Sequence, residues 1–122
     1  MMKKSAILSL AVVLLATQVL AFEQEDLDSL LKTRQCYFCK LQGANLEGRY
    51  LDNANLSLAR LNGANLRNAT LRNANLENAD LSNANLEGAV LRGAILDFAN
   101  LKGAIFCNTI LPSGDPSMKD CY

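Results

Sequence analysis

The four cysteines are the residues of this sequence that are best suited to chemistry. Cys36 and Cys39 have the Cys-x-x-Cys spacing of redox and metal-binding motifs, and Cys107 and Cys121 lie near the C-terminus. Three uses of the first pair are open at this point: a structural disulfide, free thiols, or a redox or metal site. A thioredoxin-type role calls for an exposed pair at a helix start in a βαβ setting, which this sequence does not show.

The other polar residues predict no catalytic, cofactor-binding or metal site. The sequence has no histidine and no tryptophan, and it contains no Ser-His-Asp set and no glycine-rich phosphate loop. Twelve acidic and twelve basic residues give a formal net charge of zero. This near-neutral balance indicates no strong electrostatic partner, so we expect no cofactor and no nucleic-acid binding.

The first 21 residues have the pattern of a secretory signal peptide. Two lysines precede an apolar run over residues 6–16, and Val19 and Ala21 supply the small residues for cleavage after Ala21. The alternative is an uncleaved membrane anchor, although the run is short for a spanning helix. We therefore expect export without membrane attachment, and a mature chain with ten basic and twelve acidic residues and a net charge of −2.

Most of the chain between the first and last cysteines is a five-residue repeat, so the fold of this repeat determines where the cysteines lie. Leucine recurs at every fifth residue from Leu46 to Leu101, Phe106 takes the next place, and alanine stands two residues before each of them except at Arg49. A period of five fits neither a helix nor a strand. It fits a chain that turns a corner every five residues, so that four corners close a coil of twenty residues with leucine and alanine inside. Glycine or asparagine at the repeat ends suits such corners.

The pattern Ala-(Asp/Asn)-Leu-x-x resembles the pentapeptide-repeat family, over roughly two-thirds of the chain. The resemblance implies an all-β solenoid, a right-handed quadrilateral β-helix, with about four coils over residues 34–113. Extended backwards, the register puts Cys36 in a leucine position and Cys39 in an alanine position, both facing one corner. A turn brings the two Cα atoms within about 7 Å, and exported family members often carry such a pair before their first good repeat. A Cys36–Cys39 disulfide is therefore predicted.

Non-repetitive segments flank the predicted solenoid. Residues 22–33 are predicted to form a short amphipathic helix that covers the open first coil, with binding of a partner as the alternative. Residues 114–122 are predicted to be a capping tail, because two prolines and a glycine end the repeat. A Cys107–Cys121 disulfide is predicted to pin this tail over the last coil, since a crossed pairing with Cys36 spans too great a distance. At Arg49 we expect the corner to bulge so that the side chain reaches solvent.

Outward residues twenty apart are expected to stack in columns, and the asparagines among them to form polar ladders. Two columns carry charge: Glu47, Arg67, Glu87 and Cys107 in one, and Asp52, Arg72 and Arg92 in the other. The last coil has apolar residues in outward positions. Either packing of the tail, or a contact with a second copy or a partner protein, explains these apolar residues. These residues form the candidate interaction patch: Val90, Ile95, Phe98, Ile105 and Ile110.

Together these features predict a non-enzymatic exported protein that is a structural or protein-interaction module of the cell envelope. The expected location is the periplasm, a compartment like the thylakoid lumen, or the cell exterior. The expected partner is an unidentified protein, or a second copy bound through the C-terminal coil. The alternative is a thiol–disulfide protein that uses Cys36 and Cys39. The resemblance also raises a topoisomerase-binding DNA mimic, which the near-neutral charge and the signal peptide disfavour.

Overall fold

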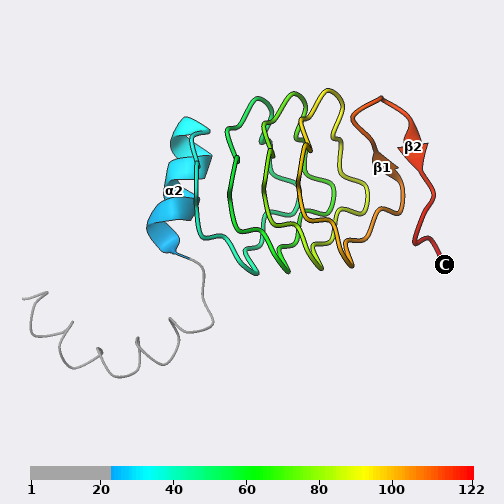
Figure 1. Cartoon of the computed structure of the whole chain (residues 1–122), viewed down its shortest axis with the longest axis horizontal. Coiled ribbons are helices and arrows are strands. Elements are labelled where there is room, and N and C mark those ends of the chain that lie inside the picture. The colour runs from blue at the N-terminus through cyan, green and yellow to red at the C-terminus, as the bar shows by residue number, and fades with distance from the viewer. Residues whose placement is uncertain (1–22) are drawn as a thin grey trace, which may run out of the picture.

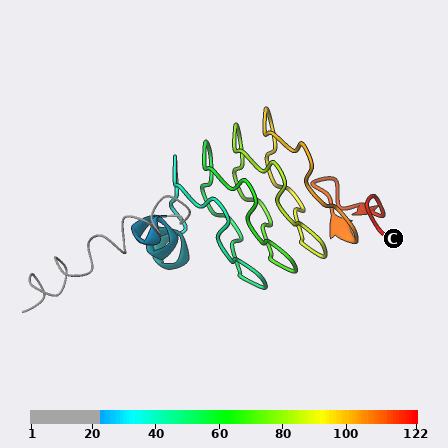
Figure 2. The ribbon, with the colours of Figure 1, turned by 90° about the horizontal axis from the view of Figure 1, so that it is seen from below.

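A computed structural model describes residues 23–122, and the predicted signal peptide, residues 1–21, lies outside this range. The described chain is a solenoid that runs from helix α2 (Gln24–Thr33) at one end to the C-terminal tail at the other (Figure 1). Within this range two short strands are assigned, β1 (Thr109–Ile110) and β2 (Pro116–Ser117). The other rungs meet their neighbours at single bridging residues, and they stack in a regular row when seen from below (Figure 2).

Parallel bridges hold the stacked rungs together. Each bridge joins residues twenty apart, and successive bridges follow at intervals of five residues across positions 35–110. The backbone hydrogen bonds run in both directions: Leu56 N–H donates to the Asn75 carbonyl at 2.7 Å, and Asn75 N–H donates to the Ala54 carbonyl at 2.9 Å. One turn of the solenoid therefore takes twenty residues and has four sides, which is the geometry predicted from the period.

The corner residue of each repeat has a positive φ, from position 38 to position 108. Glycine or asparagine takes most corners, for example Asn73 at 58° and Gly88 at 70°, because both residues tolerate the left-handed region. Phe38, Leu58 and Phe98 adopt the same conformation, at 64°, 59° and 59°. Bulky residues are rare in this region, so these three corners are strained.

Leucine fills the interior of the solenoid, as the sequence predicts. The repeat leucines from Leu41 to Leu91 are fully buried, and alanines are buried beside them. Cys36 and Cys39 are buried as well, in the leucine and alanine positions that the register assigns to them. In the last turn, which no further turn covers, the repeat leucines are only partly buried: Leu96, Leu101 and Leu111.

The backbone at Arg49 differs from the prediction. The side chain is exposed, which confirms that it reaches solvent. The predicted bulge is wrong, because the regular bridge pattern continues: Thr70 N–H donates to the Arg49 carbonyl at 2.9 Å, and Leu51 N–H donates to the Thr70 carbonyl at 2.7 Å. Arg49 belongs to the first turn, which no earlier turn covers. A long side chain at this position therefore extends into solvent without any change in the backbone.

Helix α2 lies across the N-terminal end of the solenoid (Figures 1 and 2). Its apolar face packs on the first turn, with Leu30 fully buried and Leu27 and Leu31 partly buried. Acidic residues in its first turn and Lys32 in its last turn match the helix dipole. Arg34 ends the helix in the left-handed conformation and donates its N–H to the Leu30 carbonyl at 3.0 Å. The helix covers an edge that a solenoid must protect.

The C-terminal tail folds back as a hairpin, which the sequence does not predict. Strands β1 and β2 pair antiparallel, with Thr109 opposite Ser117 and Ile110 opposite Pro116. Thr109 takes an inward alanine position and is fully buried. Its hydroxyl donates to the Leu86 carbonyl at 2.6 Å, so the buried polar group has the partner it needs.

Candidate interaction surfaces and the two ends

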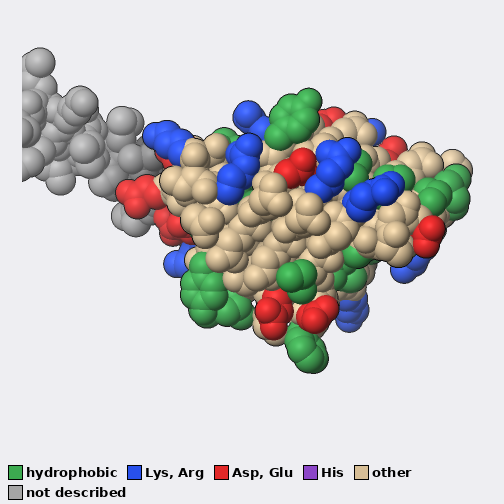
Figure 3. All heavy atoms as spheres, turned by 90° about the horizontal axis from the view of Figure 1, so that it is seen from above, with side chains coloured by type: hydrophobic (Ala, Val, Ile, Leu, Met, Phe, Trp, Pro, Cys, Tyr) green, Lys and Arg blue, Asp and Glu red, His purple; other side chains and the backbone are tan. Residues whose placement is uncertain are grey.

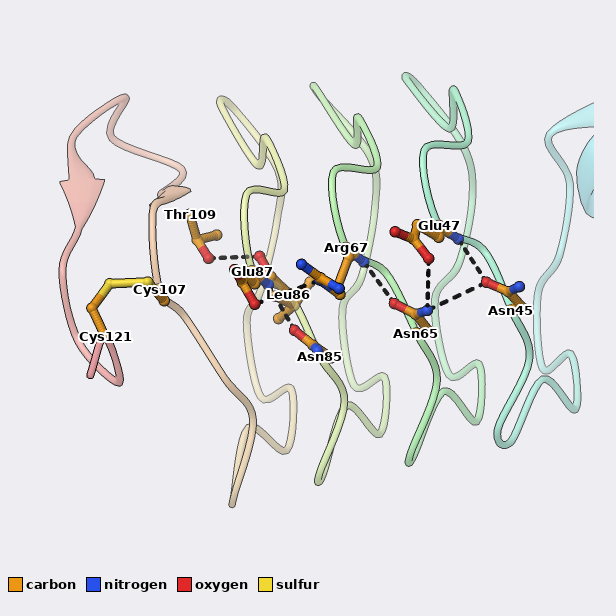
Figure 4. Close-up of polar contacts among 10 residues, drawn as sticks. All are labelled: Asn45, Glu47, Asn65, Arg67, Asn85, Leu86, Glu87, Cys107, Thr109 and Cys121. Carbon is orange, nitrogen blue, oxygen red and sulfur yellow. Dashed lines mark hydrogen bonds and ion pairs between the residues drawn. A yellow bond between two sulfur atoms is a disulfide. The ribbon is translucent and has the colours of Figure 1, made fainter.

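All four cysteines are paired, and the pairs are the two predicted from the sequence. The Cα atoms lie 5.1 Å apart in Cys36–Cys39 and 4.8 Å apart in Cys107–Cys121, within the range that a disulfide allows. The partners are separated by 3 residues in the first pair and by 14 in the second. The first bond therefore closes one corner, and the second ties the tail to the last turn (Figure 4).

The Cys36–Cys39 disulfide lies beneath the start of α2. The Asp26 carbonyl oxygen is 3.3 Å from Cys36 Sγ, and the Asp26 carboxylate accepts a hydrogen bond from Lys40 N–H at 2.7 Å. Glu23 N–H donates to the Lys40 carbonyl at 3.0 Å. Cys36 is 1% exposed and Cys39 is 6% exposed. The helix thus shields both sulfur atoms from an attacking thiolate, which needs direct access to one of them.

The Cys107–Cys121 disulfide is supported by contacts between the tail and Phe106. Phe106 N–H donates to the Asp120 carboxylate at 3.2 Å. The ammonium nitrogen of Lys119 lies 6.0 Å from the centroid of the Phe106 ring, at the outer limit of a cation–π contact. These contacts place the tail over one side of the last turn.

The charged columns pair neighbouring rungs. Arg67 Nε lies 3.5 Å from the Glu87 carboxylate (Figure 4), and Arg72 Nη1 lies 3.5 Å from the Asp52 carboxylate. These side chains are between 34% and 48% exposed, so solvent screens both pairs and each adds little to stability. The columns favour the stacking register and show no arrangement of groups for catalysis.

The outward asparagines bond mainly within their own repeats. The Oδ1 atoms of Asn45, Asn65 and Asn85 accept from the backbone N–H two residues later, at 3.2, 3.1 and 3.0 Å (Figure 4). In the part of the chain that the structure describes, a single bond joins two asparagines of neighbouring rungs, from Asn65 Nδ2 to Asn45 Oδ1 at 3.4 Å. The expected continuous ladder is wrong, because the local Asx turn occupies the side-chain acceptor.

The candidate interaction patch does not form one surface. Ile95, Ile105 and Ile110 belong to three different bridge columns, and Ile95 and Ile105 face opposite sides because ten residues make half a turn. Phe98 is 86% exposed and Ile95 is 45% exposed, whereas Val90 is partly buried. Figure 3 likewise shows hydrophobic side chains scattered among charged ones. The five residues are close in sequence, but the corners place them on different sides of the solenoid, apart from Val90 and Ile110, which are bridge partners in neighbouring turns.

Two kinds of site are not found within residues 23–122. No group of three or more His, Cys, Asp or Glu side chains there could hold a metal ion. No helix of this range has the length and apolar character needed to span a membrane. Arg34 and Tyr50, which are not among the site residues predicted from the sequence, line a pocket beside Arg49. Arg34 stands two residues before Cys36, at a second alanine position, and this is the signal that points to the pocket.

A search of the curated proteins finds no match to this chain. Among solved structures, a pentapeptide repeat protein from the Arabidopsis thaliana thylakoid lumen is 31% identical, with a TM-score of 0.59 over 66% of this chain and 53% of that one. This chain thus spans about half the length of that protein. A pentapeptide repeat protein from Nostoc is 36% identical, with a TM-score of 0.41 over 69% of this chain and 75% of that one.

One family model matches most of the solenoid. It describes pentapeptide repeats and matches residues 39–78 and 74–111, with eight copies. The matched residues make up more than half of the 122-residue chain, and they coincide with the region of twenty-residue bridges. The chain therefore belongs to the pentapeptide-repeat family and folds as a right-handed β-helix solenoid.

Proposed function

We propose that this protein is an exported, non-enzymatic module of the cell envelope, a four-coil β-helix whose mature form starts at Phe22. The observation that carries the proposal is the pairing of all four cysteines in two disulfides. Disulfides form and persist in oxidising compartments and are rare in the cytosol. Export directed by residues 1–21 supplies such an environment.

The compartment we propose is the periplasm, a lumen of the thylakoid kind, or the cell exterior. The Arabidopsis relative comes from the thylakoid lumen, which supports an exported location for this chain. All three compartments lie across a membrane from the site of synthesis, so the signal-peptide pattern fits each of them.

A structural or protein-binding role fits the surface better than catalysis does. Four outward charges of the two columns form ion pairs between neighbouring rungs, Arg67 with Glu87 and Arg72 with Asp52. The alternative, a thiol–disulfide function of Cys36 and Cys39, is disfavoured because α2 covers both sulfur atoms.

The partner we propose is another protein, or a second copy packed against the last turn. Leu96, Ala99 and Leu101 are only partly buried there, and apolar surface of this kind tends to mark contacts. A role as a DNA mimic is not proposed, because a net charge of −2 for the mature chain does not make a strongly acidic rod.

Cell fractionation with mass spectrometry tests the exported role. The protein recovered from the exported fraction should begin at Phe22 and should contain both disulfides in a non-reducing peptide map. Leu14→Arg interrupts the apolar run of the leader and is the matched control, which should keep the chain in the cytosol with reduced thiols. Exported protein that retains residues 1–21, or that carries four free thiols, contradicts the proposal.

A pull-down from envelope extract and sedimentation of the purified protein test the binding role. Ile95→Lys places a charge beside the open last turn and should reduce partner capture or self-association. Tyr37→Lys, an equally drastic change of an exposed residue near the opposite end, should leave both unchanged. Equal behaviour of the two variants argues against the last turn as the contact surface.

A further inference from the structure

A pocket of about 320 Å³ opens between the end of α2 and the first turn of the solenoid. The helix end contributes Leu31 and Arg34, and the first turn contributes Gly48, Arg49 and Tyr50. The volume is at the lower end of the range for small-molecule sites. A ligand in this pocket touches both the helix and the solenoid.

Two arginines determine the chemistry of the pocket, and both occupy positions where the repeat has alanine. One turn further along, the residue above Arg34 is Ala54 and the residue above Arg49 is Ala69, and both alanines are buried. The first turn has no earlier rung beneath it, and α2 covers this end only in part. These two positions can therefore carry long side chains, and the pocket lies where the coverage by the helix stops.

Neither arginine forms an ion pair within residues 23–122. The ion pairs of this range use Arg67 and Arg72, and no acidic residue lines the pocket. Arg34 Nη1 donates to the Leu31 carbonyl at 3.3 Å, which orients the guanidinium and leaves further N–H groups free to donate. The pocket is thus lined by two arginines whose charges no carboxylate of the described chain neutralises.

Apolar surface lies beside these two charges. The Tyr50 side chain is 72% exposed, so its ring is available to a ligand, and Leu31 adds aliphatic surface from the helix. The planar guanidinium fork matches the oxygen geometry of carboxylates and phosphates. The combination of two arginines and an exposed tyrosine ring suits a molecule with an oxyanion at one end and a flat apolar body at the other.

We propose that this pocket binds a small organic anion, namely a carboxylate or phosphate joined to a flat apolar group. Arg34 and Arg49 donate hydrogen bonds to the oxyanion, and the apolar group packs on Leu31 and Tyr50. The proposal goes beyond the exported role and does not depend on it, because it rests only on the residues that line the pocket. Inorganic phosphate shares the oxyanion but lacks the apolar body, so it distinguishes the two parts of the proposed chemistry.

Titration of the disulfide-bonded protein, followed by amide NMR, tests the site with benzoate, phenyl phosphate and inorganic phosphate. The two organic anions are expected to shift the amides of Gly48, Arg49 and Tyr50. They should bind about tenfold more tightly than inorganic phosphate, because only they bury apolar surface. Absence of shifts with all three probes overturns the site, and equal or tighter binding of inorganic phosphate overturns the organic part of the proposal.

Arg49→Ala is the decisive variant, because alanine fills the same position in the next two turns, at Ala69 and Ala89. The fold should be retained, as its melting temperature will show, while the affinity for benzoate falls about tenfold through loss of charge-assisted hydrogen bonds. Arg49→Lys keeps the charge without the fork and should bind with intermediate affinity. Arg60→Ala removes an exposed arginine outside the pocket and should change nothing. Unchanged affinity in Arg49→Ala, or an equal loss in Arg60→Ala, overturns the assignment.

Discussion

At the scale of the single residue, the corner position decides which side chains a repeat accepts. A side chain added at Gly88 would collide with the Asn68 amide of the preceding turn, and its φ of 70° is one that other residues rarely adopt. Phe98 has a φ of 59° and is 86% exposed. Its ring therefore gains little burial to offset the strained backbone.

Phe98→Gly is expected to stabilise the protein by about 1 kcal/mol, because glycine adopts this backbone conformation without steric cost. Tyr37→Gly is the matched control. Tyr37 is also an exposed aromatic, at 59%, but it is not among the residues with a positive φ, so glycine there should lower stability. Urea or thermal unfolding of both variants measures the difference. A less stable Phe98→Gly protein would show that the ring makes a contact that outweighs the strain.

The interior position is the opposite case, because it accepts only apolar side chains. Leu76 is fully buried in the middle of the leucine column. Burying a leucine contributes about 1.5–3 kcal/mol, and a buried, unpaired carboxylate costs more than that, so Leu76→Asp is expected to abolish folding. Circular dichroism and thermal melting test this, with Glu77→Ala, an exposed neighbour, as the variant that should fold normally. Cooperative melting of Leu76→Asp would refute the architecture.

At the scale of the elements, α2 and the C-terminal hairpin cover opposite ends by different means. Helix α2 uses the buried Leu30, two partly buried leucines and backbone hydrogen bonds around the Cys36–Cys39 corner. The tail uses the Cys107–Cys121 bond and the pairing of β1 with β2. Each rung of a solenoid contacts only its neighbours, so both ends limit stability.

Cys121→Ser is expected to destabilise the protein more than Cys39→Ser. The Cys107–Cys121 bond closes about 15 residues, for which loop entropy gives roughly 3 kcal/mol, whereas the Cys36–Cys39 loop is very short and constrains the unfolded chain little. Urea unfolding measures both losses, and binding of a hydrophobic dye should rise only in Cys121→Ser, where the tail is released. A larger loss in Cys39→Ser would show that the first corner, and not the tail, limits stability.

At the scale of the whole molecule, the C-terminal end of the solenoid is unevenly covered. Within residues 23–122, the N–H groups of Leu96 and Leu101 have no protein acceptor, while those of Phe106 and Leu111 bond to tail residues. The tail therefore protects one half of the last turn and leaves the other half as an open edge.

Hydrogen exchange should show this asymmetry directly. The amides of Leu96 and Leu101 are expected to exchange orders of magnitude faster than those of Leu76 and Leu81, which donate to the next turn at 2.8 Å. A dilution series is the control, because a second copy seated on the open edge would protect these amides in a concentration-dependent way. Strong protection that does not change on dilution would contradict an open edge within the single chain.

Much of this structure follows from the sequence alone, because the period of five acts locally and in every repeat. It predicts the buried leucines and alanines, the corners with glycine and asparagine, and a turn of twenty residues. Carried backwards, the same register places Cys36 and Cys39 in one buried corner, where they are bonded. These features depend on residues a few positions apart, so the order of residue types is sufficient to predict them.

Only the tertiary structure decides what happens where the repeat meets an end or closes around itself. The closed coil sends Ile95 and Ile105 to opposite sides, so neighbours in sequence do not make one patch. At the first turn, the missing rung lets Arg49 reach solvent without a bulge, and the end of α2 places Arg34 beside it to form the pocket. The sequence predicts neither result, because both depend on which surface covers a rung. The packing of α2 and of the next turn determines this coverage, and the repeat itself does not.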